Sequence, residues 1–258
     1  MNAPLFHLVH EIRERIENFD ARAAIPDFKD RLLRERPDAF EDLRGGLEGE
    51  DAQRASTRMA EIALSEIKRI PELAGTLTSE LMEGREPPAL LLTHALSLAY
   101  LVQPRDLLND DLPGGYGYLD DAIMLWASVG ARDVFVTGDE DNIERIAATI
   151  LRLCMCLPTG VREKFEPALR ENVFLIQVMS MIPPIFIGGM INNAINNPLE
   201  IRMDGGHKPA GFPGAAPWGR PTSTAGGDLF SLPGGGTGYS GDGMVCYNFD
   251  GGDVIALG

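Results

Sequence analysis

The chain has 258 residues, of which 44% are hydrophobic and 24% charged, the composition of an ordinary globular protein long enough to bury a core. Its formal net charge of −15 repels phosphate groups, so we expect no nucleic-acid partner and favour cations or basic protein surfaces. Three cysteines offer no disulfide framework, and the first twenty residues lack the basic and apolar segments of a signal peptide. We therefore expect a cytoplasmic location, with a membrane-associated one as the alternative.

The first part of the chain has the periodicity of amphipathic helices. Apolar residues recur every three or four positions over 5–19, which predicts a helix with one buried face. Residues 51–70 predict another, which Asp51 is placed to cap and Pro71 to end or kink. A shorter helix follows and stops at Gly84.

A nearly uninterrupted apolar segment comes next. Pro87 and Pro88 suit the first turn of a helix, and residues 89–102 are apolar on almost every side. The segment is shorter than the roughly 20 residues that span a bilayer, so we expect it to be buried in protein. His94 on this helix is then a hydrogen-bonded core histidine rather than a metal ligand.

The later segments extend the helical pattern. Residues 122–130 and 139–158 predict two more helices, the second with an acidic first turn. Residues 173–191 are long and apolar enough to be a membrane candidate, but Pro183–Pro184 divide them, so we expect two helices joined by a turn, with a re-entrant hairpin as the alternative. No strand–helix alternation occurs over 1–197, and we predict an all-α, irregular helical bundle there.

The composition changes after residue 197, and 16 of the 29 glycines lie beyond it. Residues 198–243 predict a flexible Gly/Pro-rich linker without its own core. In the final segment, 244–258, the β-prone runs Met244–Phe249 and Asp253–Leu257 predict a terminal β-hairpin. We expect this hairpin to dock on the helical domain or, by strand addition, on a protein partner.

Five aspartates lie between the apolar segments at 89–102 and 122–130: Asp106, Asp110, Asp111, Asp120 and Asp121. Two interpretations compete. Hard cations such as Mg²⁺, Mn²⁺ or Ca²⁺ take several carboxylate oxygens, and the candidate ligands are Asp106, Asp110, Asp120 and Asp121. Alternatively, Asp110 or Asp111 builds an Asx-turn before Pro113, and Asp120 or Asp121 caps the next helix. We favour the structural interpretation.

The spacing of this segment resembles a known family. Tyr100, Pro104-x-Asp106, Asp110, Pro113, Gly117 and Asp120–Asp121 resemble the core motif of the YkvA-like family, a bacterial domain of unknown function, over about Leu90–Leu125. The resemblance implies a compact helical hairpin, in a family whose proteins often carry membrane-like apolar helices, and implies no activity. Asn109 stands where the family usually has proline, and one extra residue separates Pro113 from Gly117, so we expect the geometry of the turn to differ from that of the family.

The sequence contains no legible serine, cysteine or histidine catalytic constellation. We therefore expect a non-enzymatic helical scaffold or protein-interaction protein, with membrane association possible and no cofactor. The alternative is a metal-dependent hydrolase that uses the aspartate cluster at 106–121 to hold Mg²⁺, Mn²⁺ or Ca²⁺.

Overall fold

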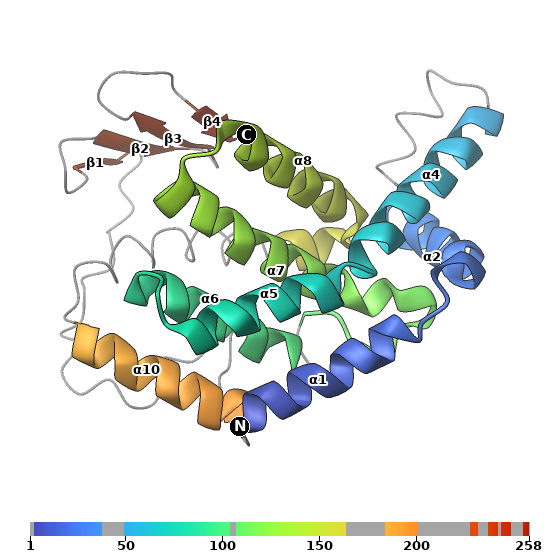
Figure 1. Cartoon of the computed structure of the whole chain (residues 1–258). Coiled ribbons are helices and arrows are strands. Elements are labelled where there is room, and N and C mark those ends of the chain that lie inside the picture. Colours follow the sequence, from blue (N-terminus) through green and yellow to red (C-terminus); the bar gives the residue numbers. More distant parts are fainter. Residues whose placement is uncertain are drawn as a thin grey trace. The chain divides into compact units, whose positions relative to one another are not determined.

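The computed structural model describes residues 3–37, 49–103, 107–163 and 184–200, together with four short strands nearer the C-terminus. The chain divides into two units, Met1–Ala210 and Gly211–Gly258, and each is described by itself. Every described element of the first unit is helical, which confirms the predicted all-α fold (Figure 1).

Eight α-helices make up the described part of this unit. They are α1 (Pro4–Glu17), α2 (Ala21–Glu35), α4 (Gly49–Ile67), α5 (Ile70–Glu83), α6 (Pro88–Leu101), α7 (Leu119–Arg132), α8 (Glu140–Cys156) and α10 (Pro184–Asn196). Short 3₁₀ segments occupy Pro113–Tyr118 and Pro198–Glu200, and a π-helical turn occupies Asp133–Thr137.

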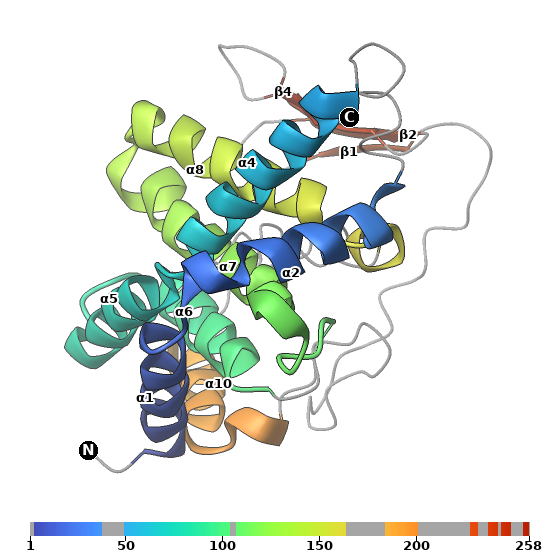
Figure 2. The ribbon, with the colours of Figure 1, turned by 90° about the vertical axis from the view of Figure 1, so that its right-hand side faces the viewer.

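Helices α6 and α7 lie at the centre of the first unit. Helix α6 contacts α5, α7 and α10, while α7 also contacts α5 and α8. In both views α1 and α10 lie on one side of α5 and α6, and α7 and α8 lie on the other (Figures 1 and 2). The hairpin of α6 and α7 is therefore covered by helices on both sides.

Burial of α6 follows the prediction for the apolar segment at 89–102. Eleven of the 14 residues of α6 are buried, so its apolar surface is covered by protein. Among the residues that the structure describes, no helix combines the length and apolarity needed to cross a bilayer. Of the second candidate, 173–191, the residues before Pro184 lie outside the described part, and Pro184 opens α10.

Several helix ends lie where their local sequence predicts. Gly84 adopts a left-handed conformation (φ 62°) and ends α5, and Pro88 stands in the first turn of α6. Two predicted details are wrong. Helix α4 begins at Gly49, so Asp51 lies inside its first turn instead of preceding it. Pro71 neither ends nor kinks that helix but lies in the first turn of α5, where an N–H has no acceptor within the helix and its absence costs no helical hydrogen bond.

Side chains from distant helices satisfy exposed helix ends. The Lys68 ammonium donates hydrogen bonds to the carbonyls of Ile16, Glu17 and Phe19 at 2.9, 2.9 and 3.0 Å. A cation at this position also offsets the negative end of the α1 dipole. Arg36, just after α2, donates to the carbonyls of Met155 and Leu157 at 3.0 and 3.2 Å, and so joins α2 to the end of α8.

The second unit contains strands β1 (Asp228–Ser231), β2 (Thr237–Gly241), β3 (Met244–Asn248) and β4 (Ile255–Leu257). They form one sheet in the order β1-β2-β3-β4, and all neighbours are antiparallel. Strands β3 and β4 fall in the two β-prone runs from which we predicted a hairpin. Strands β1 and β2 lie within 198–243, for which we predicted a linker. Strands therefore begin earlier in the chain than the two β-prone runs from which we predicted the hairpin.

Candidate functional site

The described part of the connection from α6 to α7 contains a turn built around Asn109. Its carbonyl accepts a hydrogen bond from the Leu112 N–H at 2.9 Å, and its side-chain Oδ1 accepts one from the Asp111 N–H at 3.0 Å. This is the Asx-turn that the sequence predicts at Asp110 or Asp111, but the residue that forms it is Asn109. The residue by which this chain departs from the family motif therefore makes the turn itself.

Gly117 has no room for a side chain. A Cβ atom at this position would lie 2.3 Å from the Asn109 carbonyl oxygen and 2.8 Å from the Asp110 Cα. The backbone of the 3₁₀ segment thus packs directly on the turn, which only glycine permits. This contact explains why a glycine stands at this place in the motif.

Asp120 fastens the turn to the two helices. It is fully buried in the first turn of α7, and its Oδ2 accepts hydrogen bonds from the Tyr100 hydroxyl at 2.7 Å and the Leu108 N–H at 3.1 Å. The Tyr100 hydroxyl in turn accepts from the Leu107 N–H at 3.4 Å. We predicted that Asp120 or Asp121 caps α7; these two donors to Asp120 come from α6 and from the turn. We call Tyr100, Asp120 and the Leu108 N–H the aspartate clasp.

Burial changes the acidity of two carboxyl groups in this region. Desolvation raises the pKa of Asp120 to about 7, against the lowering effect of its hydrogen bond from Tyr100. Desolvation also raises the pKa of Asp110 to about 6, although the Arg15 guanidinium acts in the opposite direction. Asp121 is buried beside Asp120 in the first turn of α7.

The described residues do not bring the predicted cation ligands together as a complete site. Asp106 lies outside them, and they contain no group of three or more His, Cys, Asp or Glu side chains placed to hold a metal ion. Within the same residues, one carboxylate oxygen of Asp110 and one of Asp120 are buried without a hydrogen-bond partner. The set Asp106, Asp110, Asp120 and Asp121 therefore stays a prediction.

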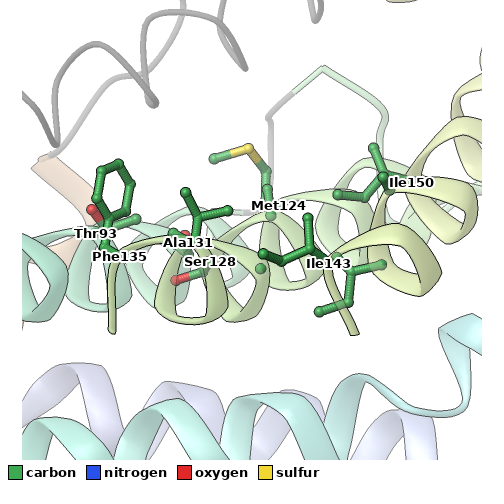
Figure 3. A pocket seen from close by; sticks show the side chains of 13 residues that line it. Thr93, Met124, Ser128, Ala131, Phe135, Ile143 and Ile150 are labelled. Atoms are coloured by element: carbon green, nitrogen blue, oxygen red, sulfur yellow. The ribbon is translucent and has the colours of Figure 1, made fainter. Parts of the chain in front are cut away.

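A second candidate site lies between α6, α7 and α8. A cavity of about 260 Å³ opens there beside the π-helical turn. In Figure 3, Phe135 and Ile150 lie toward opposite ends of the row of side chains, with Ser128 between them. The lining is mainly apolar and consists of Thr93, Ser97, Met124, Ala127, Ser128, Gly130, Ala131, Val134, Phe135, Ile143, Ile146, Ala147 and Ile150.

A chain of buried polar side chains leads away from this cavity through Ser128. The Oγ of Ser128 lies 2.8 Å from His94 Nδ1, and His94 Nε2 lies 3.0 Å from Glu80 Oε2. Arg132 approaches Glu80 at 3.4 Å and Glu86 at 3.2 Å, which completes the charge compensation. His94 is fully buried, and desolvation lowers its pKa to about 4, with Arg132 acting in the same direction. The prediction that His94 is a hydrogen-bonded core residue is confirmed.

At the mouth of the cavity, the π-helical turn exposes three apolar side chains in succession. Val134, Phe135 and Val136 are 54%, 41% and 47% exposed. The turn is held from inside, because Asp133 accepts hydrogen bonds from the side chains of Thr137 and Asn142. We call Val134, Phe135 and Val136 the apolar turn.

Sequence reasoning did not find the cavity or the partners of His94. Glu80 and Ser128 lie 14 residues before and 34 residues after it, on helices that only the tertiary fold brings together. One signal was present. His94 and Ser128 are polar interruptions in two apolar helices that are neighbours in the chain, and buried polar groups require partners.

The geometry thus defines a helical hairpin that is locked by a buried aspartate and flanked by an apolar cavity. Residues 91–127 match the family described as "Protein of unknown function (DUF1232)". The match runs from α6 through the turn into α7, where Tyr100, Gly117 and Asp120 carry the resemblance seen in the sequence. No curated protein and no solved structure gives a significant match to the chain.

Proposed function

We propose that this protein is a non-enzymatic interaction module that binds a basic amphipathic helix of a protein partner at the apolar turn. The observation that carries the proposal is the exposure of Val134, Phe135 and Val136 side by side at the mouth of an apolar cavity. Apolar side chains on the partner helix would cover the turn, as in other helix-in-groove complexes.

Charge around the apolar turn favours a basic partner. Asp139, Glu140, Asp141 and Glu144 are all exposed at the start of α8, which directly follows the turn. The neighbouring arginines are engaged, since Arg132 pairs with Glu80 and Glu86 and Arg145 binds Asn142 beside the Trp126 ring. An acidic rim of this kind attracts lysine and arginine and repels anionic lipid headgroups.

A photo-crosslinking residue in place of Phe135 tests this proposal in cells that express the full-length chain. The matched control carries the same residue in place of Met82, an exposed apolar side chain of α5. We expect a cross-linked protein that is enriched at Phe135 over Met82, with the cross-link on a basic amphipathic helix. A synthetic peptide of that helix should bind the purified chain, lose affinity as salt is raised, and bind Val136→Asp much more weakly.

Three results would contradict this function. They are equal cross-linking at the two positions, a cross-linked segment that is acidic or not helical, and a peptide whose binding is unaffected by Val136→Asp. Recovery of cross-links to lipid alone would favour membrane association instead.

The rival function, a metal-dependent hydrolase, is favoured by the buried carboxylate oxygens of Asp110 and Asp120 that have no hydrogen-bond partner among the described residues. If the aspartates only hold the turn, Mg²⁺, Mn²⁺ or Ca²⁺ should leave the melting temperature unchanged. A rise of several degrees that disappears in Asp120→Asn would favour the cation site, because a ligand that binds only the folded state stabilises it.

A further inference from the structure

The cavity between α6, α7 and α8 combines a mainly apolar lining with the hydroxyls of Thr93, Ser97 and Ser128, of which that of Ser128 is hydrogen-bonded to buried His94. We propose that it binds an uncharged aliphatic alcohol, whose hydroxyl donates a hydrogen bond to Ser128 Oγ while its alkyl chain lies along the isoleucines of α8. This ligand site stands whether or not a protein partner docks on the apolar turn.

The size of the cavity suits a small ligand. Its volume of about 260 Å³ lies just under the roughly 300–1,000 Å³ of pockets for drug-sized molecules. It also exceeds the roughly 150 Å³ at which an apolar protein cavity binds benzene. A chain of several carbon atoms therefore fits, with burial of its apolar surface as the driving force.

The lining selects against charged ligands. None of the described residues that line the cavity carries a charge, and the hydroxyl of Thr93 already donates to the Ala89 carbonyl at 3.1 Å. A carboxylate or ammonium group would lose its hydration in this lining without meeting an opposite charge, which is costly. The ligand is therefore neutral.

The chain from Ser128 to Glu80 fixes which kind of hydrogen bond the cavity offers. His94 Nε2 lies 3.0 Å from the Glu80 carboxylate without making a hydrogen bond to it, and a ring proton faces a carboxylate at this distance more favourably than a lone pair does. We therefore place the proton of the neutral ring on Nε2 and its lone pair on Nδ1. Ser128 then donates its own proton to Nδ1, at 2.8 Å, which leaves its oxygen lone pairs to accept a hydrogen bond from a ligand in the cavity that it lines. A ligand with a hydroxyl donor satisfies this oxygen, whereas a ketone or ester, which only accepts, does not.

A series of six-carbon compounds tests the donor requirement on the full-length chain. Titrations of 1-hexanol, 2-hexanone, hexanoate and hexylamine are followed by the NMR methyl signals of Ala131 and Ala147, which line the cavity. We expect 1-hexanol to bind about 3- to 10-fold more tightly than 2-hexanone, the difference that one net hydrogen bond makes. Hexanoate and protonated hexylamine should not shift these signals at the same concentrations.

Variants distinguish the role of Ser128, the proposed hydrogen-bond acceptor, from that of the other residues that line the cavity. Ser128→Ala should bind 1-hexanol and 2-hexanone equally. Thr93→Val removes another hydroxyl of the lining and should keep the preference for the alcohol, because we assign the acceptor to Ser128. Ala147→Phe fills the mouth of the cavity from the surface of α8 and should abolish binding of both.

The proposal is overturned if 2-hexanone binds the unmodified chain as tightly as 1-hexanol, if a charged member binds, or if nothing binds. Persistence of the alcohol preference in Ser128→Ala would overturn it as well. Should Ser128→Ala fail to fold because His94 loses its partner, the comparison of ligands on the unmodified chain still decides. If no partner peptide binds the apolar turn, the preference of the cavity for 1-hexanol over 2-hexanone should still be found. Failure of the proposed protein partner can therefore be distinguished from failure of the ligand site.

Discussion

At the residue scale, Asp120 shows how a buried carboxyl group can stabilise a connection. It is fully buried, and its Oδ2 receives one donor from α6 and one from the turn. Burial alone would favour the protonated form, while these hydrogen bonds favour the carboxylate. Each donor also depends on Asp120, because a buried hydroxyl or N–H that loses its acceptor destabilises the fold.

Tyr100→Phe tests the clasp. The variant keeps the ring and removes the hydroxyl that bonds to Asp120 Oδ2 and accepts from the Leu107 N–H. We expect the free energy of unfolding, measured by urea denaturation, to fall by about 1–3 kcal/mol, the usual cost of leaving a buried donor or acceptor without its hydrogen-bond partner. No change would mean that water replaces the hydroxyl and that the clasp does not stabilise the hairpin.

The raised pKa of Asp120 predicts a pH dependence of stability. The pKa of Asp120 is about 7 in the folded chain, and its ordinary value, which applies to the unfolded chain, is 3.8. Between these two pH values the folded chain therefore binds the proton more tightly than the unfolded chain does. The contribution of this bound proton to the free energy of unfolding is fully present below pH 3.8 and is lost as the pH rises through about 7. The loss is at most about 1.4 kcal/mol for each pH unit.

The comparison with Asp120→Asn isolates this carboxyl from the others. The amide cannot ionise but can still accept from Tyr100 and Leu108. We expect the free energy of unfolding of the unmodified chain to fall relative to that of Asp120→Asn as the pH rises from 4 to 7. Parallel curves for the two proteins would show that Asp120 does not titrate in this range.

At the element scale, the connection from α6 to α7 depends on close backbone contact. Gly117→Ala would place a Cβ 2.3 Å from the Asn109 carbonyl oxygen, so the turn must move. We expect a loss of more than about 2 kcal/mol in the free energy of unfolding, beyond the roughly 1 kcal/mol usual for a substitution.

Two other glycines serve as controls for this substitution. Gly84→Ala meets no atom within 4 Å but must adopt φ 62°, which costs about 1–2 kcal/mol. Gly160→Ala meets neither obstacle, so we expect a change near zero or a slight stabilisation. Equal effects of Gly117→Ala and Gly160→Ala would show that the contact with Asn109 is not tight.

The elements could be predicted from the sequence where the determinants are local. The left-handed Gly84, the proline pair at the start of α6 and the apolar stripe of α1 each act within a few residues, and these helices are where we predicted them. The partners of Asp120 and His94 could not be predicted, because their donors and acceptors come from other helices. Asn109 was missed for another reason: three adjacent Asx side chains can each form the turn, and only backbone geometry selects one.

At the scale of the whole molecule, the chain divides into a helical unit and a β-strand unit, each a compact unit by itself. Removing 211–258 should therefore leave the melting temperature of the helical unit within a few degrees of that of the full chain. Differential scanning calorimetry measures this, and the methyl NMR signals of α6 and α7 provide the control for an unchanged fold. A large drop, or insolubility of the truncated chain, would show that the strands cover helical surface.

The aspartate clasp also has a consequence for the order in which the chain folds. Its bonds join residues 20 and 12 apart, whereas Arg36 reaches Leu157 across 121 residues. Loop-closure entropy makes the longest of these contacts about 2 kcal/mol harder to form than the shortest. We expect Tyr100→Phe to slow refolding and Arg36→Met mainly to speed unfolding, as stopped-flow measurements over a range of urea concentrations would show. The hairpin of α6 and α7 would then be the nucleus on which α1, α2, α8 and α10 assemble, and the reverse pattern of rates would place the nucleus elsewhere.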